Sequence, residues 1–74
     1  MPEQNEWEKQ AANLLKSELK RKGVTYAQLV ERLDAIGISE KEANVANKLS
    51  RGKFSAAFML ACLSALQTVT LHLD

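Results

Sequence analysis

The side chains most suited to chemistry in this sequence are ammonium, amide and guanidinium groups in its second half. Four of them recur at spacings of three, four and three residues: Lys41, Asn44, Lys48 and Arg51. On a helix this spacing places them on one face, and Lys53 follows just beyond Gly52. Amide and guanidinium donors reach base edges in a major groove, and lysines neutralise phosphate. The pattern predicts a surface that binds duplex DNA, and the alternative is an ordinary solvated helix face.

A second basic cluster surrounds the lone Glu18 in the first half of the chain: Lys16, Lys20, Arg21 and Lys22. It could contact the phosphate backbone on an adjacent turn of a duplex. However, 10 Lys and Arg against 9 Asp and Glu give a formal net charge of only +1. This net charge neither demands nor forbids nucleic acid, because the distribution of the charge decides. The alternative for both clusters is an ordinary solvated helix face, which charge alone favours.

Other chemistry has little support in the sequence. His72 is the only histidine and lies on a predicted strand near the end of the chain, where a catalytic base would be poorly held. Cys62 has no basic residue within a turn to activate it, and Glu31 and Asp34 resemble a solvated helix face. One Cys and one His are too few for a zinc site, and no glycine-rich phosphate loop occurs. We expect no catalysis, metal, cofactor or small-molecule substrate.

The length and composition bound the architecture. A chain of 74 residues, of which 46% are hydrophobic, has room for one small core, so we expect a single domain over 1–74 with residues 1–4 disordered. No run of 18 apolar residues occurs, and the N-terminal residues are acidic. We therefore expect neither a membrane span nor a secretion signal, and predict a cytoplasmic protein.

Start and stop signals divide the chain into four predicted helices, over 6–22, 26–36, 40–51 and 56–67. Three starts have the form of a capping box, with a capping side chain three residues before an acid or amide: Asn5 with Glu8, Thr25 with Gln28, and Ser39 with Glu42. Ser55 is the fourth predicted cap. The three glycines, at 23, 37 and 52, fall just after a helical pattern ends, where a left-handed residue closes a helix.

The spacing of apolar residues gives each predicted helix a buried face. In the first two helices we expect burial of Trp7, Ala11, Leu14, Leu15, Leu19, Leu29, Val30, Leu33 and Ile36. In the last two we expect burial of Val45, Ala46, Leu49, Phe58, Met59, Cys62 and Leu66. The basic stripe of the third helix then faces away from the core.

The fourth predicted helix is apolar nearly all round, and three short neighbours can hardly cover it. Residues 68–73 alternate strictly and are rich in β-branched side chains, which predicts a C-terminal strand without a partner strand in its own chain. A second copy would cover the helix and pair the strand, so we expect a homodimer. Its predicted interface consists of Ala57, Leu60, Ala61, Ser64, Val69, Leu71 and Leu73.

The stretch from Glu18 to Gly52 resembles the phage-repressor type of helix-turn-helix. The likeness is carried by Gly23, Thr25 and Leu29 around the start of the second helix, and by Arg51, Gly52 and Lys53 at the exit from the third. In that family short helices pack together, the residue after the threonine contacts phosphate, and the third helix reads bases. The resemblance implies that Tyr26 contacts phosphate and that the stripe from Lys41 to Arg51 reads the groove.

A closer likeness covers nearly the whole chain. The runs from Trp7 to Lys20 and from Asn47 to Ser55 resemble those of a small bacterial domain family of unknown function. This likeness implies an all-helical, repressor-like fold and does not assign a reaction. We predict an all-α helix-turn-helix domain of four to five helices with a short C-terminal β-strand, acting as a dimeric, non-catalytic DNA-binding regulator. The alternative is a homodimeric protein-interaction or assembly module that keeps the fold without binding DNA.

Overall fold

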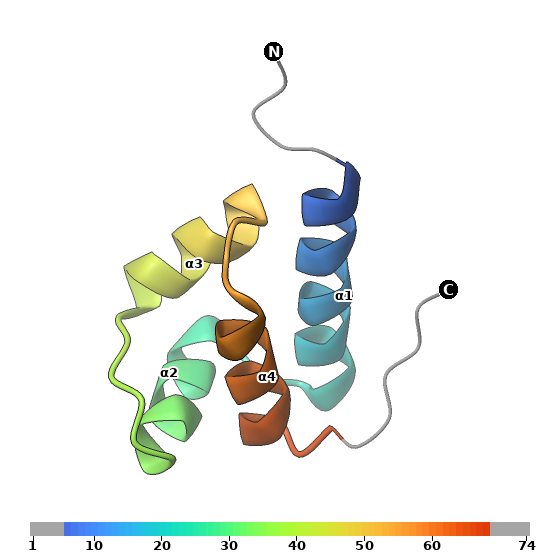
Figure 1. Ribbon diagram of the computed structural model, residues 1–74. Helices are drawn as coiled ribbons and strands as arrows, with labels where there is room; N and C mark the ends of the chain where they lie inside the picture. The colour runs from blue at the N-terminus through green and yellow to red at the C-terminus, as the bar shows by residue number, and fades with distance from the viewer. Residues whose placement is uncertain (1–5, 69–74) are drawn as a thin grey trace.

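The computed structural model describes residues 6–68 and is all-helical over that range (Figure 1). The helices are α1 (Glu6–Lys22), α2 (Tyr26–Ala35), α3 (Glu42–Arg51) and α4 (Ala56–Ala65). α1 packs against α3, and α2 packs against both α3 and α4. In the view of Figure 1, α3 lies above α2, and α4 lies between α2 and α1. The number and order of the predicted helices are confirmed for the described residues.

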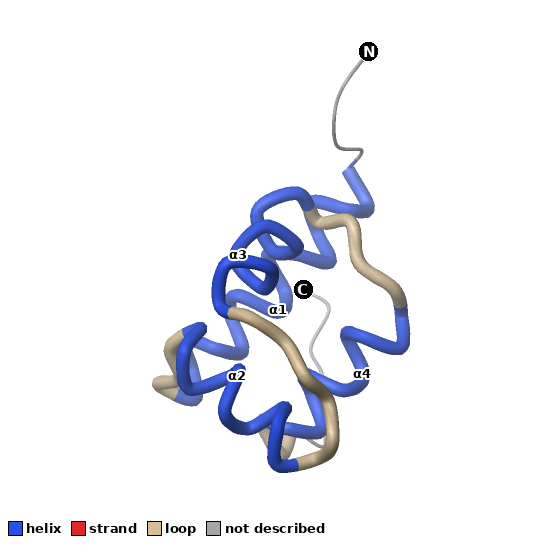
Figure 2. The backbone as a smooth tube through the Cα atoms, turned by 90° about the vertical axis from the view of Figure 1, so that its left-hand side faces the viewer, coloured by secondary structure: helices blue, strands red, loops and turns tan. Residues whose placement is uncertain are grey.

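The described residues contain helices and loops but no strand (Figure 2). Of the predicted strand over 68–73, Thr68 is described and is not in a strand. Its amide instead donates to the carbonyl of Leu63 at 2.9 Å, in the turn that closes α4. Residues 69–73, and the residues 1–4 predicted to be disordered, lie outside the described range.

The helix starts show which capping signals the chain uses. The Thr25 hydroxyl accepts from the Gln28 amide at 3.1 Å, and the Gln28 side chain accepts from the Thr25 amide at 2.9 Å. The capping box of α2 is therefore confirmed, as is the Ser55 cap of α4. The predicted box at Ser39 is wrong, because α3 begins two residues later than predicted, after Lys41, which makes no side-chain cap.

Three helices end in the same hydrogen-bonded turn, a Schellman motif. In each, an amide donates at 2.9 Å to a carbonyl five residues earlier: Val24 to Leu19, Ile38 to Leu33 and Thr68 to Leu63. The motif needs one residue in the left-handed region, which is Gly23 (φ +68°) after α1 and Gly37 (φ +88°) after α2. After α4 this residue is Gln67 (φ +59°), so α4 ends at Ala65, two residues before its predicted end.

One hydrophobic core joins the four helices. Its most completely buried members are Leu15, Leu29, Leu33, Val45, Leu49, Cys62 and Leu66. Each of these residues was expected in the core, and burial of one such leucine contributes roughly 1.5–3 kcal/mol. Val30 and Met59, also expected there, pack against the core while staying partly exposed.

Two residues predicted in the core are exposed. Trp7 is 77% exposed, because it lies in the first turn of α1, before Ala12, the first buried residue of that helix. Ile36 is 47% exposed, because α2 ends before it and the chain reverses at Gly37. Ile38 packs against the core instead. Both predictions are therefore wrong, because Trp7 lies in the first turn of α1 and Ile36 lies after the last residue of α2.

Candidate nucleic-acid interface

α3 carries most of the residues predicted to contact DNA. At 100° per residue, Lys41, Asn44, Lys48 and Arg51 fall within roughly 80° of arc, and we call this set the α3 polar face. Lys41 at the N-cap, Asn44 and Arg51 are exposed, as is Lys53 just after the helix. On the inward side of the helix, Val45 and Leu49 are completely buried. The core therefore fixes the direction in which the polar face points.

Lys48 is the member of the α3 polar face whose ammonium group is bound within the protein. Its Nζ donates to Oε2 of Glu40 at 2.7 Å and lies 4.4 Å from the centre of the Phe58 ring. The Glu40 side chain is only 13% exposed, so water shields this pair incompletely. Phe58 also packs against Phe54, with ring centres 5.7 Å apart. Lys48 therefore ties the loop over 36–41 to α3 and α4.

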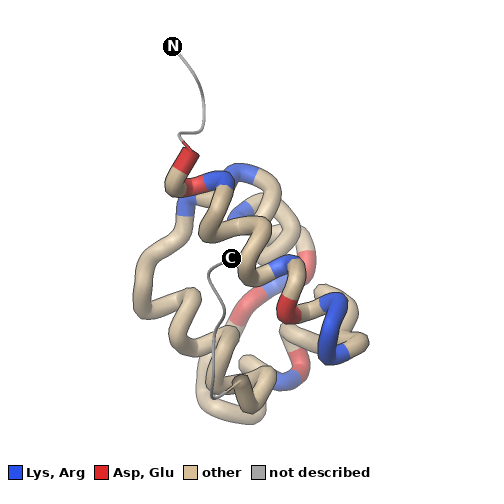
Figure 3. The backbone as a smooth tube through the Cα atoms, turned by 90° about the vertical axis from the view of Figure 1, so that its right-hand side faces the viewer, with Lys and Arg blue, Asp and Glu red and all other residues tan. Residues whose placement is uncertain are grey.

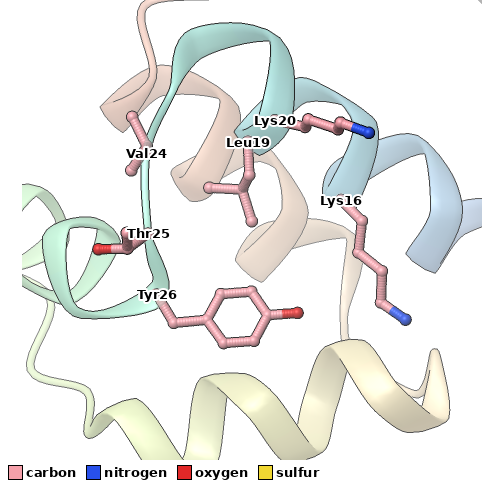
Figure 4. A pocket seen from close by; sticks show the side chains of 6 residues that line it. All are labelled: Lys16, Leu19, Lys20, Val24, Thr25 and Tyr26. Atoms are coloured by element: carbon pink, nitrogen blue, oxygen red, sulfur yellow. The ribbon is translucent and has the colours of Figure 1, made fainter.

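Tyr26, the residue predicted to contact phosphate, is half-buried at the first position of α2. Its ring extends between α1 and α3 beside an open pocket (Figure 4). This pocket, which we call the α1–α2 pocket, has a volume of about 390 Å³ and is lined by Lys16, Leu19, Lys20, Val24, Thr25 and Tyr26. In Figure 4 the Tyr26 hydroxyl and the amines of Lys16 and Lys20 extend to the same side. The structure thus brings Tyr26 together with two members of the second basic cluster.

Basic residues gather at the C-terminal end of α1 (Figure 3). One of them, Arg21, forms an ion pair with Glu18, which was not predicted from the sequence. Glu18 is 6% exposed, and its carboxylate accepts from Nε of Arg21 at 3.0 Å and from Nη2 at 2.8 Å. These hydrogen bonds and the charge of Glu18 raise the pKa of Arg21. The available signal was the spacing of three residues between an acid beside Leu19 and an arginine. The Arg21 guanidinium is therefore already bound to a carboxylate.

The outer side of α4 is the predicted dimer interface. Leu60 is 66% exposed, Ala57 and Ser64 are exposed, and Ala61 is half-buried. The described residues of the chain therefore leave this side of α4 largely uncovered. The other predicted interface residues, Val69, Leu71 and Leu73, lie outside the described range. The dimer stays a prediction.

Cys62 is buried and is not activated. The pKa of its thiol is raised to about 11, first by burial and then by the Glu40 carboxylate, while Lys48 lowers it. Such a thiol is protonated at neutral pH and is a poor nucleophile. Within residues 6–68, no group of three His, Cys, Asp or Glu side chains is placed to hold a metal ion. No described helix combines the length and apolar character needed to cross a bilayer.

The fold and this surface define a small all-helical domain whose third helix presents a polar, partly basic face. The chain belongs to the family described as domain of unknown function DUF6471, which matches residues 7–71. Membership in a family of unknown function agrees with the likeness seen in the sequence, and the phage-repressor likeness stays a prediction. No curated protein and no solved structure matches the chain.

Proposed function

We propose that this domain binds duplex DNA without catalysing a reaction, and that the α3 polar face enters the major groove. The observation that carries the proposal is the exposure of Lys41, Asn44 and Arg51 on a helix that Val45 and Leu49 anchor in the core. A helix fits the major groove, where an Asn amide pairs with adenine and an Arg guanidinium with guanine. In this proposal α2, the loop over 36–41 and α3 serve as a repressor-like helix-turn-helix.

Contacts to the phosphate backbone are the second part of the proposal. Lys41 precedes α3 and Lys53 follows it, so an exposed ammonium group flanks the helix at each end. Such contacts fix the register of a protein on the duplex without reading its sequence. A formal net charge of +1 supports only weak binding by one copy. Two copies on a palindromic site would raise the affinity through effective concentration.

Selection from a pool of random-sequence duplexes, followed by fluorescence anisotropy with the enriched duplex, tests the proposal. The double variant Lys41→Gln with Asn44→Ala removes two exposed donors and should weaken binding by about an order of magnitude or more. Lys9→Gln with Gln10→Ala removes the same two kinds of group from the first turns of α1 and should cost no more than about twofold. Enrichment of no duplex, or equal binding by the first variant and the wild type, would refute the assignment.

A second candidate is a homodimeric assembly module that does not bind DNA, and a different observation favours it. Leu60 is 66% exposed on the outer side of α4, between exposed Ala57 and half-buried Ala61. A second copy would remove these apolar side chains from water. Light scattering at micromolar concentration should give twice the monomer mass, and Leu60→Gln should shift the mass toward the monomer. A dimer that enriches no duplex supports this candidate over DNA binding, and a monomeric mass for the intact chain refutes it.

A further inference from the structure

The α1–α2 pocket has two chemically different parts. Its apolar part is formed by Leu19 and Val24, which are 3% and 8% exposed, together with the ring of Tyr26. Its polar part is formed by the amines of Lys16 and Lys20 and by the Tyr26 hydroxyl, which extend to one side in Figure 4. A volume of about 390 Å³ is within the range of pockets that hold small molecules.

The charged groups that line the pocket are both cations and favour an anionic ligand. Lys16 and Lys20 are four residues apart on α1, so their like charges face the same side of the helix and repel each other. None of the six lining residues is acidic, and neither amine is in an ion pair with another described residue. The hydroxyl and amide of Thr25 are used by the capping box with Gln28. Cations and one phenol therefore remain as the polar groups that a ligand would meet.

We infer that the α1–α2 pocket binds a small amphipathic anion, with an apolar ring against Leu19, Val24 and Tyr26 and a carboxylate or phosphate group between Lys16 and Lys20. This inference goes beyond the proposed DNA binding and does not depend on it. The anionic group has two possible sources, a free small molecule or the backbone of a duplex. The apolar part distinguishes them, because a backbone phosphate contacts the lysines but leaves the partly exposed ring of Tyr26 without an apolar partner.

An NMR titration of the full, ¹⁵N-labelled chain tests the inference with four small compounds. 1-Naphthylacetate carries both the ring and the charge, 1-naphthylacetamide carries the ring alone, and acetate and inorganic phosphate carry the charge alone. We expect naphthylacetate to shift the backbone amides of the six lining residues in a saturable way. The neutral amide should bind about fivefold or more weakly, since it loses contacts to two ammonium groups. Acetate and phosphate should not saturate over the same concentration range.

Matched variants locate the anionic group. Lys16→Gln and Lys20→Gln should each weaken naphthylacetate binding by about two- to fivefold, because each removes one exposed ion pair with the ligand. Lys9→Gln makes the same change on the same helix, outside the pocket, and should leave the affinity unchanged. Unchanged amide shifts away from the pocket confirm that each variant is folded. Because all three lysines are exposed, at least one pocket variant and the control are expected to fold.

Several results would overturn the inference. Equal affinity for naphthylacetate and its amide would show that the lysines play no part, and equal effects of Lys9→Gln and Lys16→Gln would show only a general charge effect. Phosphate binding as tight as that of naphthylacetate would define a plain phosphate site. A random-sequence duplex is the last test: if it shifts the lining amides and naphthylacetate does not, the pocket is a contact for the DNA backbone and not a site for a small molecule.

Discussion

Two connections in this domain begin alike and end differently. The connection after α1 and the one after α2 both open with a Schellman motif around a left-handed glycine, Gly23 or Gly37. The first reaches α2 within residues 23–25 and ends in the Thr25 capping box. The second runs over 36–41 and reaches α3 without a side-chain cap. In the second connection the Glu40 carboxylate accepts a hydrogen bond from Lys48 of α3.

The two connections differ in what determines the start of the helix that follows. The start of α2 is determined by neighbouring residues, and the start of α3 by contacts that form only in the folded chain. The Thr25 cap uses a partner three residues away, so the neighbouring sequence is sufficient to form it. Ser39 has the same spacing to an acid, but Glu40 beside it pairs with Lys48, whose amine lies over Phe58 of α4. The start of α3 is therefore set by contacts between elements. The residue at which α3 begins, and with it the place of Lys41 in the α3 polar face, depends on this second connection.

The largest expected effect concerns Cys62, whose thiol lies close enough to Glu40 and Lys48 for both charges to affect its pKa. Because that pKa is raised from 9.0 to about 11, the thiolate fraction at pH 8 falls roughly a hundredfold on folding. We expect iodoacetamide to alkylate the folded chain at least about a hundredfold more slowly than the chain in urea, as followed by mass spectrometry. Similar rates in the two conditions would show that the hydrophobic core does not cover this thiol.

The next effect tests the second connection directly. Lys48→Ala leaves the Glu40 carboxylate, whose side chain is 13% exposed, without its cation and removes the contact with Phe58. We expect a loss of about 2 kcal/mol in the free energy of unfolding, between the values typical of exposed and of buried pairs. Urea unfolding followed by circular dichroism measures it, with Lys9→Ala as the exposed control. A loss below about 0.5 kcal/mol would mean that the pair does not hold the loop.

A matched pair of alanine substitutions compares the two predicted capping boxes. Thr25→Ala removes a hydroxyl that caps α2 and should cost about 1 kcal/mol. Ser39→Ala removes an exposed hydroxyl that caps no helix and should cost less than about 0.5 kcal/mol. Urea unfolding of both variants gives the difference. Equal losses would mean that Ser39 caps α3 in solution and that the comparison between the connections is wrong.

The sequence was sufficient where a signal and its partner are close together. The bounds of α1, the first residues of α2 and α4, and the left-handed glycines all follow from local patterns. The start of α3 does not, because Glu40 finds its partner eight residues away. The burial of Glu18 was not predicted, because a charged residue at the edge of an apolar face is expected to stay in water. In the structure the Glu18 carboxylate is buried and pairs with Arg21, three residues later on α1.

The candidate site, like the fold, could be predicted from the sequence only where it depends on a single helix. The spacing of Lys41, Asn44 and Arg51 fixes a common face once α3 is a helix, and all three are exposed. The α1–α2 pocket could not be predicted, because it depends on how the ring of Tyr26 lies beside α1. The contact between Lys48 and Phe58 likewise needs the packing of α4. The residues that share one face of a helix can be predicted from the sequence, whereas contacts between side chains of different helices cannot.

The smallest expected effect concerns the first turns of α1. Trp7 is 77% exposed, so Trp7→Ala should change the free energy of unfolding by less than about 0.5 kcal/mol. For the same reason the emission maximum of the native protein should match that of a solvated tryptophan and should barely move in urea. A blue-shifted native spectrum, or a loss of several kcal/mol, would place Trp7 in a contact such as a subunit interface.

The proposed contact between the α3 polar face and duplex DNA predicts that binding depends on salt concentration. Each phosphate neutralised by a lysine adds about −0.9 to the slope of the logarithm of the binding constant against the logarithm of the salt concentration. With the enriched duplex we predict a steep negative slope for the wild type. Lys41→Gln should make that slope shallower by about 1, and Lys9→Gln should leave it unchanged. A flat slope for the wild type, or identical slopes for the wild type and Lys41→Gln, would contradict the claim.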